Sequence, residues 1–230
     1  MTPPPGIIEI PQTGQWVIEG DSHLSKWSLE KGTIITDPWL FRFLKDYLED
    51  AGMGRHQRFT IFDVGANIGD HCRQYLDWGC EVVAFEPNPL AFQCLSHNCP
   101  TADCRNVAAS DKNGEASFMR LENAGASRIQ AGGDILVKTA ILDDLTLPKP
   151  DFLKLDIEGH ELSALIGMER TITECRPLAV VEINRGALAA NHVTPEDVIG
   201  WFENRGYSSD IIYPASAKRS DEQYDILFLP

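Results

Sequence analysis

The chain has 230 residues, of which 43% are hydrophobic and 23% are charged, and its formal net charge is −14 at pH 7. This length and composition predict a soluble globular protein with one main domain. The acidic balance argues against a nucleic-acid partner, because binding phosphate backbones needs clustered lysine and arginine side chains. The sequence has neither an apolar run long enough to span a membrane nor the layout of a signal peptide. We therefore predict a cytoplasmic protein with no membrane partner.

The six cysteines contain no C-x-x-C pair. Cys94, Cys99 and Cys104 recur at even spacing, which would also suit a metal site. We predict reduced thiols, buried or partly buried, because such cysteines behave as small apolar side chains.

The N-terminal region shows few clear elements. The prolines at 3–5 predict an extended, poorly ordered start, and residues 16–37 have no clean period. From Pro38, apolar residues follow at helical spacing, with Gly52 after the last turn. This pattern predicts an amphipathic helix. Residues 1–58 are thus expected to form a tail, a lid segment and this helix.

From residue 59 onward, strand-like and helix-like segments alternate, which predicts a mostly parallel sheet with helices on both faces. The last two runs, YSSDIIY and YDILFLP, are joined by a polar loop and predict a terminal hairpin with one antiparallel strand. We assign residues 59–230 to this α/β domain. The predicted strands lie near 59–64, 81–86, 103–108, 151–156 and 178–183, and the predicted helices near 69–78, 89–97, 159–173 and 194–205.

Residues 111–140 interrupt the alternation. Turn signals at Asn113-Gly114 and Gly132-Gly133 separate short apolar patches. These turns predict a hairpin-like insertion in the domain.

The most informative motif is FDVGANIGD at 62–70, where an apolar strand ends in Asp63 and a glycine turn leads into a helix start. About 20 residues after the turn, a second apolar strand ends in Glu86, where an acid can accept ribose hydroxyls. The spacing is not the G-x-G-x-x-G of dinucleotide enzymes, and an acid directly precedes the turn. This combination favours S-adenosylmethionine over NAD.

Each part of this motif has an expected role. Gly65 allows a tight turn and Gly69 a close approach to a ligand, while the following helix offers free N–H groups to a carboxylate. Asp63 is placed for the ammonium end of the cofactor, Glu86 for the ribose, and residues 106–108 for the adenine. The alternative is structural: Asp63 caps a turn and Glu86 starts the next helix. The predicted cofactor residues are Asp63, Gly65, Ala66, Asn67, Gly69, Asp70, Glu86, Pro87, Asn88, Asn106, Val107, Ala108 and Asp156.

A family resemblance follows from four segments in order: FDVGANIGDH, VVAFEPNPLAFQCLSHN, DFLKLDIEGHELSALIGM and AVVEIN. Together they resemble the FkbM family of S-adenosylmethionine-dependent methyltransferases over roughly residues 59–185. The resemblance implies a class I methyltransferase (Rossmann-like) fold. It also implies O-methylation of a hydroxyl on a sugar, glycan or polyketide-like small molecule, without identifying the acceptor.

The densest group of titratable residues is KLDIEGHE, at the end of a predicted strand. Methyl transfer from a sulfonium is an in-line displacement, and a hydroxyl acceptor must also lose a proton. We predict Asp156, Glu158 and His160 as catalytic residues, with Asp156 or Glu158 contacting cofactor and acceptor and His160 acting as base. The alternatives are a solvent-facing His160, and acids at 158 and 161 that merely favour the positive end of a helix.

Oxygen-rich side chains on neighbouring strand ends raise the alternative of a magnesium site. Asp156, Glu182 and Asn184 offer the ligands that hard divalent cations prefer. This alternative rests on analogy with sugar O-methyltransferases outside the family. We predict no metal, with these residues making hydrogen bonds instead.

The acceptor is expected to contact the N-terminal segment and the 111–140 insertion. The candidates could stack on a sugar ring or hold an anion, although aromatic residues more often fill cores. They are Trp16, His23, Trp27, Trp39, Arg120, Arg128 and His192.

Three other functions remain open from the sequence. One is a nicotinamide-dependent oxidoreductase, which the missing dinucleotide motif disfavours. Another is a nucleic-acid methyltransferase, but the N/D-P-P-Y/F signature is absent from the predicted fourth strand, which reads KLDIEG. The third is a non-catalytic cofactor-binding protein. The sequence is also compatible with a homo-oligomer.

Overall fold

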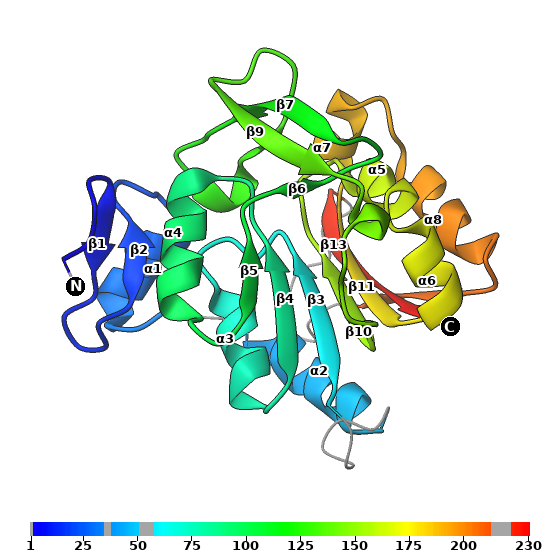
Figure 1. The fold of residues 1–230 in the computed structure, drawn as a ribbon, viewed down its shortest axis with the longest axis horizontal. Coiled ribbons are helices and arrows are strands. Elements are labelled where there is room, and N and C mark those ends of the chain that lie inside the picture. Colours follow the sequence, from blue (N-terminus) through cyan, green and yellow to red (C-terminus); the bar gives the residue numbers. More distant parts are fainter. Residues whose placement is uncertain (1, 35–37, 51–57, 213–221) are drawn as a thin grey trace.

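The computed structural model describes residues 2–34, 38–50, 58–212 and 222–230 (Figure 1). Its centre is a seven-stranded sheet in the order β12-β13-β11-β10-β3-β4-β5. Strand β13 runs antiparallel to both of its neighbours, whereas the other pairs are parallel. The predicted mostly parallel sheet with one antiparallel strand is therefore confirmed. The strands are β3 (Thr60–Val64), β4 (Glu81–Phe85), β5 (Asp103–Arg105), β10 (Phe152–Leu155), β11 (Leu178–Asn184), β12 (Ser208–Ile212) and β13 (Gln223–Leu229).

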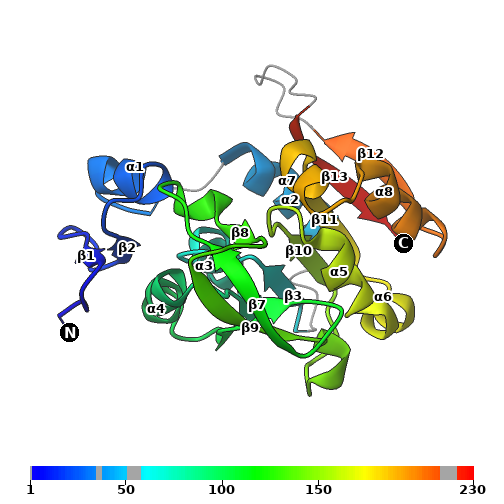
Figure 2. The ribbon, with the colours of Figure 1, turned by 90° about the horizontal axis from the view of Figure 1, so that it is seen from above.

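Helices cover both faces of this sheet (Figure 2). Successive strand residues point to opposite faces, so Ile61 packs with one group of helices and Phe62 with the other. One face carries α2 (Pro38–Asp50), α3 (Asp70–Asp77) and α4 (Pro89–Asn98). The opposite face carries α5 (Glu161–Ile166), α6 (Glu169–Cys175) and α8 (Pro195–Glu203).

The predicted amphipathic helix is α2, and its buried residues Phe41, Leu44 and Leu48 follow the predicted helical spacing. The side chain of Trp39 lies outside the described part of the chain. All six cysteines are free thiols, four buried and two half-buried, in agreement with the prediction.

Two predicted elements are divided in the structure. The predicted strand at 103–108 becomes β5 and β6 (Ala108–Ala109), which belong to different sheets. The predicted helix at 159–173 becomes α5 and α6, broken at Gly167. A Cβ at Gly167 would lie 2.0 Å from the carbonyl oxygen of Ser110, so the chain bends where another backbone segment touches it. Helix α7 (Arg185–Ala190) was not predicted.

The N-terminal region is more ordered than predicted. Strands β1 (Ile7–Glu9) and β2 (Trp16–Ile18) form an antiparallel hairpin, and α1 (Leu24–Lys31) follows. The Asn98 side chain on α4 makes two 2.8 Å hydrogen bonds with the backbone of Trp16, whose ring stacks on that of His97. The strands are too short to give a local pattern, and their packing partner lies 82 residues away.

Residues 111–140 contain a pair of antiparallel strands, β7 (Gly114–Met119) and β9 (Ile135–Ala140). With β8 (Arg128–Ile129) and β6 they form a four-stranded sheet. Figure 1 shows β7 and β9 above the carboxyl ends of β3, β4 and β5. Two 3-10 turns, Ala124–Ala126 and Leu142–Asp144, flank this sheet. Among the described residues, no helix is long and apolar enough to cross a membrane.

Candidate functional site

A cavity lies where the carboxyl ends of β3, β4 and β10 face the four-stranded sheet. Its volume is about 840 Å³, including the part open to solvent. This is the position where ligands bind in open α/β sheets, and the size suits a small organic ligand. The strand ends form one wall. The opposite wall consists of Phe118, Ala124, Gly125, Ser127 and Ile129.

The glycine turn after β3 shapes the floor of the cavity. Gly65 has a φ of +93°, and its N–H donates to the carbonyl oxygen of Phe85 at 3.0 Å. A Cβ at Gly65 would lie 1.8 Å from the carbonyl oxygen of Asp156. Only glycine fits this turn, since a side chain would collide with the end of β10.

Glu86 lies beside this turn, at the end of β4. The N–H of Asn67 donates to its Oε2 at 2.9 Å, and the N–H of Asn88 donates to its Oε1 at 2.7 Å. Burial raises the pKa of Glu86 to about 7, although both N–H bonds favour the charged form. Each carboxylate oxygen keeps a further lone pair, so this fixed side chain can accept hydrogen bonds from the hydroxyl groups of a ligand.

Four predicted cofactor residues do not line the cavity: Ala66, Gly69, Asn88 and Asn106. A Cβ at Gly69 would lie 2.7 Å from Cys99 Sγ. The backbone of Gly69 therefore lies close to α4 and the segment after it. Asn88 caps α4, and the Asn106 amide donates to the carbonyl oxygens of Glu86 and Pro87. Asn88 and Asn106 thus brace the loops around the cavity. The predicted residues that line it are Asp63, Gly65, Asn67, Asp70, Glu86, Pro87, Val107, Ala108 and Asp156.

The cavity wall is strongly acidic. Asp63 is only 1% exposed, and among the described residues its Oδ2 has no hydrogen-bond partner. Burial raises the pKa of Asp63 to about 8 and that of Asp70 to about 7. Burying a carboxylate oxygen without a hydrogen-bond partner costs free energy unless a ligand supplies the partner. Asp63 therefore suits a cationic or hydrogen-bond-donating group.

Sequence reasoning missed two residues that line this wall, Lys154 and His71. Lys154 Nζ donates to Asp156 Oδ2 at 2.8 Å. Lys154 could have been found from the sequence, because it is a lone lysine within the apolar run FLKL and lysine is almost never buried without a partner. Burial lowers the pKa of His71 to about 3, so its imidazole is neutral.

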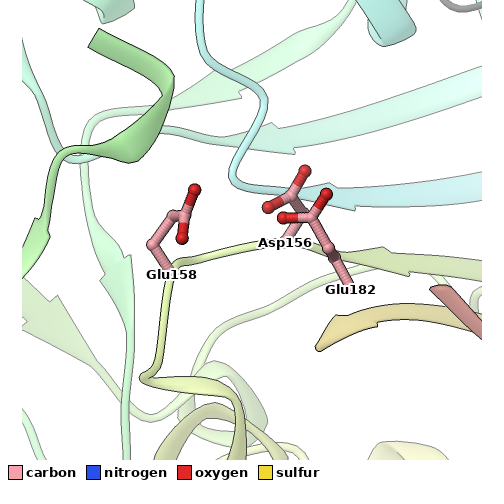
Figure 3. A group of neighbouring side chains, drawn as sticks. All are labelled: Asp156, Glu158 and Glu182. Carbon is pink, nitrogen blue, oxygen red and sulfur yellow. The ribbon is translucent and has the colours of Figure 1, made fainter. Parts of the chain in front are cut away.

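Three carboxylates gather at the ends of β10 and β11 (Figure 3). Single oxygens of Asp156, Glu158 and Glu182 all lie within 4.8 Å of one another. Burial alone would raise the pKa of Asp156, but the Lys154 ammonium and a hydrogen bond from Glu182 keep it below its ordinary value. Burial and the charge of Asp156 raise the pKa of Glu182 well above its ordinary value. The surroundings therefore favour the charged form of Asp156 and the protonated form of Glu182.

The predicted magnesium alternative does not match this geometry at Asn184. The Asn184 amide donates to Glu158 Oε2 at 2.8 Å, and its carbonyl oxygen accepts the N–H of Ala187 to cap α7. Its oxygen is therefore engaged in the helix cap, and the nitrogen facing the acids is not a ligand for a hard cation. The oxygen-rich group contains Glu158 in its place.

Glu158 is held in an unusual conformation. Its φ is +56°, which is strained for a residue with a side chain, and such strain clusters at functional sites. Burial raises its pKa to about 7. Glu161 is buried and accepts the N–H groups of Ile157 and Gly159, so it braces the same loop. Glu158 lines the cavity, so the alternative in which it merely favours the positive end of the helix does not describe its position.

His160 also lines the cavity and is not turned to solvent. Its Nε2 lies 3.0 Å from the Oγ of Ser110, and burial lowers its pKa. The ring is therefore neutral at pH 7 and already has one hydrogen-bond partner.

The N-terminal segment supports the outer wall through Asp21. Asp21 Oδ1 accepts the N–H of Ala124 at 2.9 Å, and Oδ2 accepts the N–H of Ser25 at 2.6 Å. Of the predicted acceptor contacts whose side chains are described, none lines the cavity. Trp27, next to His23 on α1, is 44% exposed, whereas Trp16 is buried.

Comparisons with known proteins agree with this architecture. A family model described as "Methyltransferase FkbM domain" matches residues 63–209. The chain is 32% identical over 162 residues to the hexuronic acid methyltransferase AglP of Haloferax volcanii, covering 66% of this chain and 64% of AglP. The chain thus spans just under two thirds of that relative.

Solved structures share the fold. A methyltransferase FkbM from Methylobacillus flagellatus superposes with a TM-score of 0.50 at 19% identity, covering 75% of this chain and 45% of the other. A TehB-like SAM-dependent methyltransferase from Corynebacterium glutamicum gives 0.51 at 13% identity, covering 91% and 97%. The sheet described above is thus the sheet of class I methyltransferases.

Proposed function

Because this chain belongs to the FkbM methyltransferase family, we propose that it transfers a methyl group from S-adenosylmethionine to a hydroxyl group of a sugar or glycan. The observation that carries the proposal is Glu86, buried beside the glycine turn with both oxygens aimed by backbone N–H groups. An acid at this strand end accepts ribose hydroxyls in nucleotide-binding sheets. The family also argues against the nicotinamide alternative.

The charge of the cavity supports a cationic donor. Five carboxyl groups line it, and Lys154 is the one lysine or arginine among its described lining residues; the acids are Asp63, Asp70, Glu86, Asp156 and Glu158. The unpartnered Oδ2 of Asp63 fits the donor's ammonium group. When bound, S-adenosylmethionine supplies a methyl group activated by its positively charged sulfur.

The acids at the end of β10 are placed for the acceptor. Asp156 stays ionised and orients the acceptor hydroxyl. With the donor bound, Glu158 would accept the proton that the acceptor hydroxyl loses as its oxygen takes the methyl group from the donor's sulfur. A carboxyl pKa of about 7 suits a general base at neutral pH. The fixed positions of both side chains favour an in-line approach.

The acceptor class follows from the relative and from the site. AglP is by name a hexuronic acid methyltransferase. The charged Asp156 carboxylate favours an acceptor that presents a neutral hydroxyl group at the reacting end, since an anion would be repelled there. The net charge of −14 disfavours a nucleic-acid acceptor.

A direct assay tests the activity. The full chain is incubated with S-adenosylmethionine and a panel of acceptors: neutral hexosides, hexuronosides, a polyketide alcohol and RNA. We expect S-adenosylhomocysteine release and a product heavier by one methylene group with a sugar acceptor, read by mass spectrometry. Binding of the donor with no turnover on any acceptor would point to a non-catalytic protein, and turnover on RNA alone would reject the sugar assignment.

Donor binding should depend on pH. Buried Glu86 and Asp63 have raised pKa values of about 7 and about 8, so both are largely protonated at pH 6. Because a cation and ribose hydroxyls favour the ionised forms, we expect affinity to fall between pH 8 and pH 6 by up to about tenfold through Glu86 and up to about fiftyfold through Asp63. Calorimetry in two buffers of different ionisation enthalpy should show proton release on binding. An affinity constant across this range would contradict the assignment.

The free protein should respond to pH in the opposite direction. Folded carboxyl groups with raised pKa values hold protons that the unfolded chain has lost above about pH 5. Their contribution to the free energy of unfolding is therefore fully present at low pH, falls progressively above about pH 5 and is lost once the pH has risen through 7 to 8. Thermal unfolding without the donor measures the pH dependence of stability in the free protein, and unfolding with the donor measures the pH dependence of donor binding. Glu86→Gln should weaken both pH dependences.

A further inference from the structure

Lys154 is a buried cation at the centre of an acidic site. It lies on β10, opposite Asp63 in the parallel register with β3, and is 3% exposed. Its Nζ lies 2.8 Å from Asp156 Oδ2. Burial alone would lower the pKa of Lys154, but the carboxyl groups of Asp156, Asp225 and Glu182 raise it above its ordinary value. The ammonium is therefore charged across the ordinary pH range.

The neighbouring acids have the chemistry of a ligand set for a hard divalent cation. Asp156, Glu158 and Glu182 each bring one oxygen within 4.8 Å of the others (Figure 3). One contact opposes such an ion. The Lys154 ammonium lies 2.8 Å from Asp156 Oδ2, and it would repel a divalent cation bound to the same carboxylate.

We propose that Lys154 is the built-in cation of the acceptor site: through its 2.8 Å contact it holds the Asp156 carboxylate in place, and it takes the place of a divalent metal ion. Lys154 is thus a positioning residue that acts through Asp156. Its effect on turnover rests on the proposed methyl transfer, whereas its effect on metal binding does not.

The test compares two substitutions in the full chain. Lys154→Met keeps most of the apolar stem and removes the charge, whereas Lys154→Arg keeps the charge. Mn²⁺ binding is measured by electron paramagnetic resonance without donor or acceptor. We expect no binding by the wild type or Lys154→Arg at micromolar Mn²⁺, and new binding by Lys154→Met that is lost again in Lys154→Met/Glu182→Gln. Lys138→Met, at an exposed position on β9, is the matched control and should stay metal-free.

Turnover gives the second readout. The wild type should be unaffected by EDTA. Lys154→Met should lose at least about tenfold in kcat with a smaller change in the KM for the donor, and added Mn²⁺ should restore part of the loss. Loss of wild-type activity in EDTA, or micromolar Mn²⁺ binding by the wild type, would overturn the proposal. Both wild-type measurements stand even if Lys154→Met does not fold, and the binding result stands even if no acceptor is methylated.

Discussion

Glu158→Gln should lower kcat by about 10²–10⁴-fold, because the acceptor hydroxyl then lacks its general base. The substitution keeps the size of the side chain and leaves an oxygen that can accept from the Asn184 amide. Affinity for S-adenosylmethionine should change by no more than a few-fold, since Glu158 acts on the acceptor. Steady-state kinetics and calorimetry on the same preparation separate the two effects.

Two further variants make the assignment of the base specific. His160→Gln should reduce kcat less than Glu158→Gln, because the neutral His160 ring has the Ser110 hydroxyl as its partner. Glu115→Gln, at an exposed position on β7, should leave kcat unchanged. A larger loss for His160→Gln than for Glu158→Gln would move the base to His160. Wild-type kcat in Glu158→Gln would remove Glu158 from the mechanism.

Glu86→Ala should weaken binding of S-adenosylmethionine by about 100-fold or more. A hydrogen bond to a charged group contributes about 1.5–3 kcal/mol, and in the proposed role Glu86 accepts two from the ribose. Two such bonds correspond to at least two factors of ten in the dissociation constant. Calorimetry provides the measurement.

Loss of Glu86 also leaves the N–H groups of Asn67 and Asn88 without their acceptor. Glu86→Gln keeps one acceptor oxygen and should give an intermediate affinity, and thermal unfolding should show that it retains the fold. Glu81→Gln, at the exposed start of the same strand, is the matched control and should bind normally. Undiminished binding by Glu86→Ala would refute the predicted role of Glu86 in cofactor binding.

Local patterns were sufficient for the elements that line the cavity. The runs ending in Asp63 and Glu86 are apolar strands followed by turn residues, and Thr194 with Asp197 forms the capping box at the start of α8. These signals lie within a few residues of the structure they specify. They predicted the sheet, its antiparallel strand and most of the cavity lining.

Contacts between distant segments could not be predicted in the same way. The N-terminal hairpin is hydrogen-bonded to Asn98, and Gly167, where the predicted helix is divided, lies against the backbone of Ser110. The chemistry of individual side chains was also undetermined, since Asn184 appeared to offer an oxygen and in the structure turns its amide nitrogen toward Glu158. Lys154 went unnoticed because its importance comes from the carboxylates around it.

By itself, the sequence determined the fold class, the glycine turn and the acid at the end of β4, because each follows from local strand, turn and helix preferences. The tertiary structure decided which polar groups meet at the end of β10. Burial raises the pKa values of Glu158 and Glu182, whereas the nearby Lys154 lowers that of Asp156. Such differences arise from desolvation and neighbouring charge, which depend on distances between strands and not on spacing along the chain.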